Sequence, residues 1–316
     1  MRAQPGDGPP EAVYAAVDWG GTWIRVALVS AGRILHRERI RRPGSLSDQY
    51  AAIASGVGLC AQAVDASPEA TGVGIAGIVQ GQAVMTAINL GIVSRTEVGT
   101  DLAAALAGPV CIANDTQSAA SSLAHRWVDD VTAVLSMGTG VGGALIDRGK
   151  LVLGHGAAGD YGHMVLDVAG PPCPCGGRGC FEMLVSGKAL AAAAHDLAFS
   201  GQSPMLEARY GTRGSLHAGD LQDAAAAGEP SAVAALRGSA SIFASGIRSI
   251  VAAVDPARIV LTGSLLSDEA LFGRLVRERW EATRPSWSST SLVHVPEDED
   301  ATLLGAARLA AQHLTA

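Results

Sequence analysis

Strand-like apolar runs that end in glycine-rich turns dominate the first part of the chain. Residues 13–18 form such a run, residues 19–22 form the turn, and residues 23–30 and 33–40 continue as strands. Apolar spacing typical of helices follows over residues 46–64 and 101–107. Further strands are predicted at 71–79, 83–88 and 110–113. This alternation of strands and helices indicates the α/β class.

The second part of the chain repeats the opening theme. A helix is predicted at 116–127, with Asn114 and Asp115 as residue types that favour a helix N-cap. A strand at 132–137, a glycine-rich turn at 138–143 and strands at 144–147 and 150–153 then follow, before loop-like residues 154–180. The remaining elements are helices at 182–199, 231–254 and 301–313 and a strand at 258–262. The pattern predicts two duplicated α/β domains with a central cleft.

The expected boundaries follow from this repeat. Residues 1–11 are rich in proline and glycine and are predicted to be a loose tail. Residues 12–115 with 301–316 would form the N-terminal domain. Residues 116–300 would form the C-terminal domain, which carries the loop at 154–180.

Composition narrows the class of protein. Of 316 residues, 48% are hydrophobic and 17% charged, which argues against disorder. No apolar run is long enough for a membrane span, and the first residues lack the apolar core of a secretory signal. The net charge of −7 disfavours nucleic acid as a partner. We therefore expect a cytoplasmic protein that binds neither membranes nor nucleic acid.

The glycine-rich turns suggest phosphate binding. Residues 138–143 and 72–77 both match the dinucleotide pattern G-x-G-x-x-G. A strand instead of a helix follows Gly143, and no strand precedes Gly72, so nicotinamide or flavin binding is disfavoured. Hairpin glycines let backbone N–H groups approach phosphate oxygens, Thr22 and Thr139 add hydroxyl donors, and Asp18 could hold magnesium through water. The alternative is that both turns are tight hairpins without a ligand.

A His/Cys cluster points to a metal ion. His163, Cys173, Cys175 and Cys180 lie within a loop whose prolines and glycines exclude regular structure. Three thiolates and one imidazole suit a closed, structural zinc site. A disulfide with a free thiol, or three reduced cysteines, are the alternatives. A zinc-ribbon reader of DNA is disfavoured, since the loop has only one basic residue. The zinc would bring Asp160 and Glu182 near one another.

Together these motifs resemble the ROK sugar kinases and their repressor relatives. The resemblance rests on Asp-Trp-Gly-Gly-Thr at 18–22, Asn-Asp at 114–115, Gly-Thr-Gly-Val-Gly-Gly at 138–143, Ala-Gly-Asp-Tyr-Gly-His at 158–163 and the cysteine loop at 173–182. It covers roughly residues 13–313. The resemblance implies an actin-like (ribonuclease H-like) fold, with ATP and sugar in the cleft, as in the zinc-containing glucokinase and hexokinase branch.

The resemblance also implies roles for individual residues. Asp115 would be the catalytic base that accepts a proton from a sugar hydroxyl, most simply the 6-hydroxyl. Sugar-binding residues would be Gly77, Asn89, Asn114, Asp160, His163 and Glu182. Residues that face ATP and magnesium would be Asp18, Gly20, Gly21, Thr22, Gly138, Thr139, Gly140 and Gly263. Homodimers or homotetramers are common in this family.

Three positions depart from the family pattern, and all fall in binding loops. Asp160 stands where the family usually has Glu, and Ala76-Gly77-Ile78 stands where the family usually has a proline-flanked turn. Ser264 replaces the second glycine after the strand at 258–262. Because of these departures, the sequence does not decide whether the sugar is glucose, mannose, fructose or an amino or N-acetylamino hexose. Two other functions remain alternatives. One is a regulator related to the repressors, which is disfavoured because only 17 residues precede Asp18. The other is a non-catalytic sugar sensor.

Overall fold

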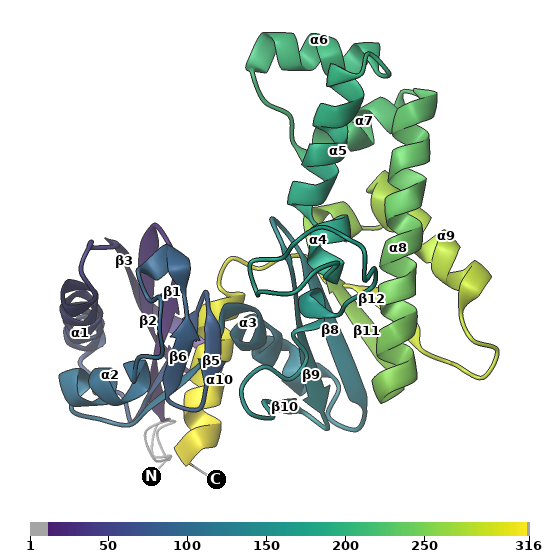
Figure 1. Cartoon of the computed structure of the whole chain (residues 1–316). Coiled ribbons are helices and arrows are strands. Elements are labelled where there is room, and N and C mark those ends of the chain that lie inside the picture. Colours follow the sequence, from purple (N-terminus) through teal and green to yellow (C-terminus); the bar gives the residue numbers. More distant parts are fainter. Residues whose placement is uncertain (1–11, 315–316) are drawn as a thin grey trace, which may run out of the picture. The chain divides into compact units, whose positions relative to one another are not determined.

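The computed structural model describes residues 12–314, which divide into two compact units (Figure 1). Unit 1 takes in the chain up to Arg126, Leu153–Ala158 and the chain from Asp298 onward, and unit 2 takes in Trp127–Val152 and Gly159–Glu297. The predicted tail 1–11 lies outside the described residues. The predicted boundary after Asp115 differs from this division, because α3 (Asp115–Leu123) packs along α10 (Ala301–Leu314) within unit 1.

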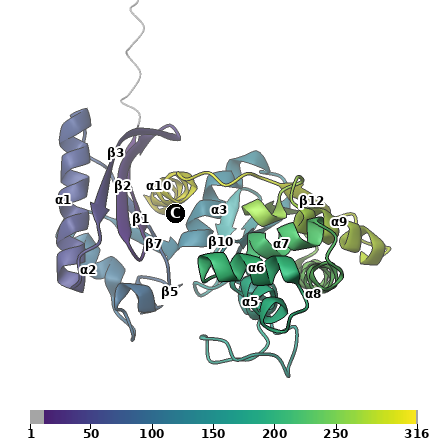
Figure 2. The same cartoon turned by 90° about the horizontal axis from the view of Figure 1, so that it is seen from above.

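A five-stranded sheet forms the centre of unit 1, in the order β3-β2-β1-β4-β7. Its strands are β1 (Val13–Trp19), β2 (Trp23–Ser30), β3 (Arg33–Arg41), β4 (Thr71–Ile75) and β7 (Val110–Asn114). The first three are antiparallel, whereas β4 and β7 run parallel to β1. The helices α1 (Leu46–Val64) and α2 (Val98–Leu106) cover one face, and α3 and α10 the other (Figure 2).

The predicted strand 71–79 is divided. β4 ends at Ile75, and the chain turns before β5 (Ile78–Gln80), which pairs with β6 (Ala83–Thr86) in a separate hairpin. At Gly77 a Cβ atom would lie 2.6 Å from the Thr86 carbonyl oxygen, so the hairpin closes only over a glycine. The 3-10 turn η1 (Ile88–Leu90) follows.

Unit 2 is built on a second sheet, in the order β10-β9-β8-β11-β12. Its strands are β8 (Val131–Met137), β9 (Val141–Asp147), β10 (Lys150–Val152), β11 (Arg258–Thr262) and β12 (Ser291–His294). The first three are antiparallel and the last two run parallel to β8, which is the topology of unit 1. The predicted duplication is therefore confirmed, although β12 was not predicted.

The helices of unit 2 pack on this sheet and on each other. They are α4 (Phe181–Val185), α5 (Gly187–Phe199), α6 (Pro204–Arg213), α7 (Ala218–Ala226), α8 (Pro230–Val254) and α9 (Leu271–Thr283), with short turns η2 (Ala124–Arg126, in unit 1), η3 (Tyr161–His163) and η4 (Ser264–Leu266). The buried rings of Phe181, Phe243 and Phe272 lie side by side in this core. The predicted helix 182–199 divides at Ser186, whose side chain caps α5. The helices α6, α7 and α9 were not predicted.

Close packing of α10 on α3 gives a test of the fold. At Gly305 a Cβ atom would lie 1.6 Å from the Ser118 carbonyl oxygen. Gly305→Ala is therefore expected to lower the free energy of unfolding by about 1–3 kcal/mol or more, as overpacking does. Gly238→Ala, at an exposed position of α8 with open space, should instead raise it by about 0.5–1 kcal/mol. Thermal denaturation of the two variants measures the contrast, and equal midpoints would contradict this packing.

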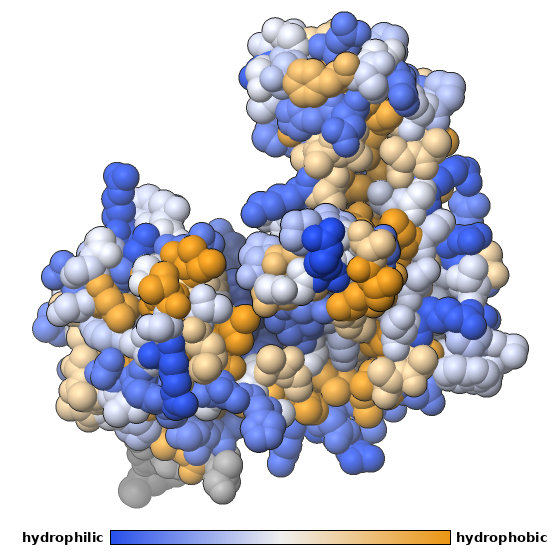
Figure 3. All heavy atoms as spheres, viewed as in Figure 1, coloured by the Kyte–Doolittle hydropathy of each residue, from blue (hydrophilic) through white to orange (hydrophobic). Residues whose placement is uncertain are grey.

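The surface is mostly hydrophilic on the face shown in Figure 3, with separate apolar patches. Among residues 12–314, no helix has both the length and the apolar character needed to cross a bilayer.

Candidate functional site

The first glycine-rich turn joins β1 to β2 in unit 1. The Gly20 N–H donates to the Trp23 carbonyl oxygen at 3.0 Å and closes the turn, while Gly21 and Thr22 are exposed. Trp19 is fully buried, and its indole N–H donates to Gln49 Oε1 at 2.9 Å. The Trp19 side chain thus packs beneath the turn, and Gly21 and Thr22, which are predicted to face phosphates, lie at the surface.

Asp18 stands beside this turn and is paired with an arginine that the sequence analysis missed. Arg25 lies directly opposite Asp18 in the β1–β2 ladder. Its Nε donates to Asp18 Oδ2 at 2.7 Å, its Nη2 contacts the same oxygen, and its Nη1 donates to the Glu299 carbonyl oxygen. The only signal available in the sequence was the alternation of β2, which places Arg25 among buried apolar residues.

The carboxyl ends of β1, β4 and β7 bring Asp18 near the Asn114–Asp115 pair. Asp18 lies opposite Gly74 in the ladder, and Gly74 lies opposite Ala113. Since these strands are parallel, the residues that follow them meet at one edge of the sheet. Asp18 and Asp115 are close enough for the charge of Asp18 to act on Asp115.

Asn114 caps α3, as its residue type predicted. Its Oδ1 accepts from the backbone N–H of Thr116 at 2.9 Å and of Gln117 at 3.4 Å, and Gln117 Oε1 accepts from the Asn114 N–H at 3.3 Å. The Asn114 Nδ2 also donates to the Gly77 carbonyl oxygen at 3.0 Å. The structure thereby joins two predicted sugar-binding residues and leaves the Asn114 amide one N–H for another acceptor.

Asp115 occupies the first turn of α3, half-buried. Its Oδ1 accepts the Thr116 N–H at 2.8 Å. Burial raises the pKa of Asp115 above its usual value, and the nearby negative charge of Asp18 adds to this, while the Thr116 N–H opposes it. A raised pKa at the meeting edge of three strands is the electrostatic character expected of a general base.

Asn89 lies in the exposed turn η1, next to the first glycine-rich turn. A Cβ atom at Gly21 would be 3.5 Å from the Asn89 Cβ. Gly77 and Asn89 flank the open end of the β5–β6 hairpin, so unit 1 gathers its predicted sugar and phosphate residues on one edge.

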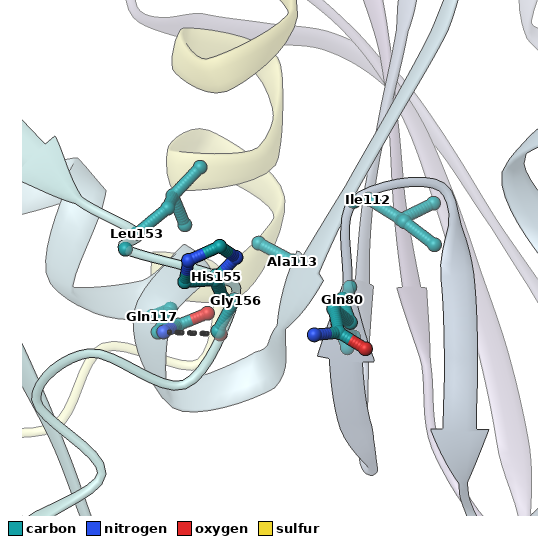
Figure 4. A pocket seen from close by; sticks show the side chains of 10 residues that line it. Gln80, Ile112, Ala113, Gln117, Leu153, His155 and Gly156 are labelled. Atoms are coloured by element: carbon teal, nitrogen blue, oxygen red, sulfur yellow. Dashed lines mark hydrogen bonds between the residues drawn. The ribbon is translucent and has the colours of Figure 1, made fainter.

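A cavity of about 320 Å³ lies at the other end of this hairpin (Figure 4). Its lining comprises Val79, Gln80, Gly81, Ile112, Ala113, Gln117, Leu153, Gly154, His155 and Gly156, none of which was a predicted site residue. Gln117 Nε2 donates to the Gly156 carbonyl oxygen at 3.0 Å. Gln117 thus joins the cap of α3 to the loop 153–158.

The second glycine-rich turn joins β8 to β9 in unit 2 and is shorter than predicted. It covers Gly138–Gly140, with the Gly138 N–H donating to the Gly140 carbonyl oxygen at 3.1 Å. Residues 141–143 already belong to β9, a correction that follows from their pairing with β8. Gly138 and Thr139 are exposed, and their carbonyl oxygens accept from the first N–H groups of α5.

Gly263 adjoins this second turn. It follows β11 with a φ of +114°, and a Cβ atom there would lie 2.2 Å from the Met137 carbonyl oxygen. Glu182 approaches from α4, since a Cβ atom at Gly140 would lie 2.8 Å from Glu182 Oε2. Unit 2 thus brings Gly138, Gly140, Gly263 and Glu182 together.

Asp160 and Glu182 flank the imidazole of His163. His163 Nε2 is 3.9 Å from Asp160 Oδ2, and its Nδ1 is 3.8 Å from Glu182 Oε1. Burial raises the pKa of Asp160, the charge of Glu182 adds to this, and His163 opposes it. The two predicted sugar-binding carboxyl groups therefore lie on either side of one ring.

His163 also belongs to a cluster with the three loop cysteines. One donor atom from each of the four residues lies within 4.8 Å of all the others. Cys175 Sγ is 3.6 Å from Cys180 Sγ, and Cys173 Sγ is 3.6 Å from His163 Nδ1. Zn–S bonds of about 2.3 Å in a tetrahedron place two sulfurs about 3.8 Å apart, so the donor set fits a zinc ion. Burial raises the pKa of the Cys173 thiol to about 12.

Known proteins are similar to this chain in sequence and in fold. The sequence matches the ROK family over residues 14–313, and the chain belongs to that family. It is 30% identical to the N-acetylmannosamine kinase of Citrobacter koseri over 305 residues, which cover 93% of this chain and 97% of that protein.

Two solved structures extend the comparison. A ROK hexokinase from Thermus thermophilus matches with a TM-score of 0.83 and 25% identity, over 96% of this chain and 99% of the other. A ROK glucokinase from Streptomyces griseus, solved with glucose and AMPPNP, matches with a TM-score of 0.75 and 27% identity, over 95% and 100%. The expected actin-like α/β fold is confirmed by these similarities.

Proposed function

We propose that this ROK family chain, an ATP-dependent sugar kinase, transfers the γ-phosphoryl group of ATP to the 6-hydroxyl of a hexose or hexose derivative. The observation that carries the proposal is Asp115, a half-buried carboxylate with a raised pKa at the edge where β1, β4 and β7 end. The similarity to known sugar kinases supports the reaction class.

Asp115 is the general base of the proposed reaction. Its Oδ1 is oriented by the Thr116 N–H. The carboxylate accepts the proton of the sugar hydroxyl as that hydroxyl attacks phosphorus. Phosphoryl transfer depends mainly on positioning and charge stabilisation, so deprotonation is needed only late.

The phosphates of ATP are bound by backbone groups. The turn at Gly20–Thr22 in unit 1 and the turn at Gly138–Gly140 in unit 2 each offer N–H groups beyond the one that closes the turn. Each also has a threonine hydroxyl and glycines without side-chain bulk. The chain's net charge of −7 makes such amide donors more important than basic side chains. Gly263 forms part of the adenosine site.

Magnesium and zinc have separate roles. The residues present fit magnesium, because Asp18 offers a hard carboxylate oxygen beside the first turn. Magnesium supplies positive charge that offsets the charge of the transferring phosphates. Zinc, held by His163, Cys173, Cys175 and Cys180, is structural and fixes the loop that carries Asp160 and Glu182.

The proposed sugar-binding residues are Gly77, Asn89 and Asn114 in unit 1 and Asp160, His163 and Glu182 in unit 2. Named relatives act on N-acetylmannosamine or were solved with glucose, so both belong in the test. Asp160 also suits an ammonium group, which makes aminohexoses a third class. We further expect a homodimer or homotetramer, which light scattering measures.

Sugar-dependent ADP release tests the proposal. The purified chain, with ATP and magnesium, is expected to release ADP with at least one sugar among N-acetylmannosamine, glucose, mannose, fructose and glucosamine. Mass spectrometry should find one added phosphate, absent when the 6-deoxy sugar is used. Sugar binding without ADP release across the whole panel would contradict the kinase and favour a non-catalytic sensor.

A further inference from the structure

Arg25 is the strongest feature of unit 1 that the proposed mechanism does not use. The side chain is 30% exposed, and the Asp18 side chain is 16% exposed. Arg25 and Asp18 face each other across the β1–β2 ladder, so a single backbone register sets the distance between them. Two nitrogens of one guanidinium, Nε and Nη2, contact the same carboxylate oxygen, Oδ2.

Because Arg25 contacts only Oδ2, the two oxygens of the Asp18 carboxylate have different surroundings. Oδ2 is held by Arg25, whereas no described residue donates a hydrogen bond to Oδ1. Charge-assisted contacts of this kind fix the plane of a carboxylate. A group that must meet a hydrated metal ion benefits from this, because outer partners that orient a ligand are worth about 10–100-fold in metal affinity or activity.

The guanidinium is itself anchored at a third point. Its Nη1 donates to the carbonyl oxygen of Glu299, just before α10 begins at Ala301. Arg25 is therefore fixed between a strand and the segment that precedes the last helix. Arg37 reaches the same segment, where its Nη1 lies 2.8 Å from Asp300 Oδ1, but the Arg37 side chain makes no hydrogen bond or ion pair with Asp18.

Charge gives Arg25 a second effect on the site. Asp18 and Asp115 are both carboxylates at the same edge of the sheet, and they repel one another. The guanidinium offsets the charge of Asp18 from the side of β2, which limits this repulsion.

The geometry points to Arg25 as the positioning residue of the phosphate-binding turn: it holds Asp18 by Oδ2 and leaves Oδ1 for the hydrated magnesium ion that accompanies ATP. This inference rests on the proposed function, since it concerns how the same site receives magnesium and nucleotide. A lysine could keep the charge at this position, but it cannot make the two contacts to Oδ2 and the contact to Glu299 together.

Nucleotide binding with and without magnesium tests the inference. Isothermal titration calorimetry measures the affinity for ADP in buffer freed of magnesium by a cation-exchange resin, and again with magnesium added. Arg25→Met is expected to weaken binding of the magnesium–ADP complex about 10-fold while the affinity for metal-free ADP stays within twofold. Arg25→Lys should fall between Arg25→Met and the wild type.

Arg37→Met is the matched control. It also removes an arginine contact to the segment before α10, yet it leaves Asp18 untouched, so both affinities should stay within twofold of the wild type. Steady-state kinetics should show a raised KM for magnesium–ATP in Arg25→Met and an unchanged KM for the sugar.

Three results would overturn the inference. One is an unchanged magnesium–ADP affinity in Arg25→Met, another is an equal loss for metal-free and magnesium-bound ADP, and the third is the same loss in Arg37→Met. If Arg25→Met fails to fold, Arg25→Lys decides, and wild-type affinity in that variant overturns the inference. The calorimetry needs no sugar, so it still distinguishes the variants if the wild type phosphorylates no sugar and the proposed function fails.

Discussion

Replacing Asp115 with asparagine is expected to lower kcat for sugar phosphorylation by about 10²–10⁴-fold, the range that a positioned general base contributes. Asparagine keeps the size of the side chain and its first-turn position in α3, but it cannot accept the proton of the sugar hydroxyl. The measurement is sugar-dependent ADP release at saturating ATP and sugar. Sugar affinity, measured by calorimetry, should change much less than kcat.

Asp101→Asn is the matched control for this substitution. Asp101 also lies in the first turn of a helix of unit 1, where it is exposed and accepts the Tyr50 hydroxyl at 3.3 Å. Its replacement should leave kcat within twofold of the wild type. A folded Asp115→Asn variant that retains kcat within threefold would remove Asp115 from the role of base.

The raised pKa of Asp115 predicts how Asp115→Asn changes the thermal midpoint and how pH changes the wild-type kcat. Burial, with the charge of Asp18, raises this pKa in the folded state. A carboxyl group whose pKa is higher in the folded state than in the unfolded state adds to stability when it is protonated. Its contribution is complete below the pKa of the unfolded state and is lost as the pH rises through the pKa of the folded state. At pH 8 the ionised Asp115 therefore opposes folding, so the thermal midpoint of Asp115→Asn should equal or exceed that of the wild type. Wild-type kcat should fall as the pH is lowered through the raised pKa.

Replacing one of the proposed zinc ligands is expected to have the second large effect, on zinc content and on sugar phosphorylation. Cys175→Ser is expected to reduce the zinc content from about one ion per chain to a small fraction, and to lower kcat/KM for the sugar at least 10-fold. Cys175 is the exposed thiol of the cluster, so its replacement removes a ligand without leaving a buried cavity. The loop 164–180 contains only isolated bridges and turns, so the proposed metal ion would be its main source of order.

Elemental analysis, thermal denaturation and steady-state kinetics together measure this effect. Cys111→Ser provides the control, because Cys111 is a free thiol of β7 outside the cluster. Its zinc content should match that of the wild type. Wild-type protein with far less than one zinc per chain, or a Cys175→Ser variant with unchanged midpoint and kcat/KM, would show that the loop is ordered without a metal.

Local pattern was enough to predict most elements that carry the site. The helix α1 and the strands β2 and β11 have the predicted bounds, because apolar periodicity and flanking turns define them locally. The N-cap at Asn114 could also be predicted from the sequence, since a single side chain accepts from the first N–H groups of α3. The break at Gly77 and the division at Ser186 were missed, because both depend on contacts with residues distant in the sequence.

The candidate site was predictable to the extent that its chemistry lies in short motifs. Glycines at hairpin turns, the cysteine spacing and the Asn114–Asp115 pair need only a few adjacent residues to be recognised. Arg25 was missed because its contacts depend on the β1–β2 register and on Glu299, and Gln117 because its partner Gly156 lies far along the chain.

By itself, the sequence determined the α/β class, the duplication, the two glycine-rich turns and the four residues of the His/Cys cluster, since all of these follow from local periodicity and residue type. Only the tertiary structure decided that Arg25 holds Asp18 by one oxygen, that Asn114 joins Gly77 to α3, and that His163 lies between two carboxyl groups. The physical reason is that sheet register and loop packing set these contacts. Neither register nor packing follows from residue type and local periodicity alone, even where the two partners are close in the sequence.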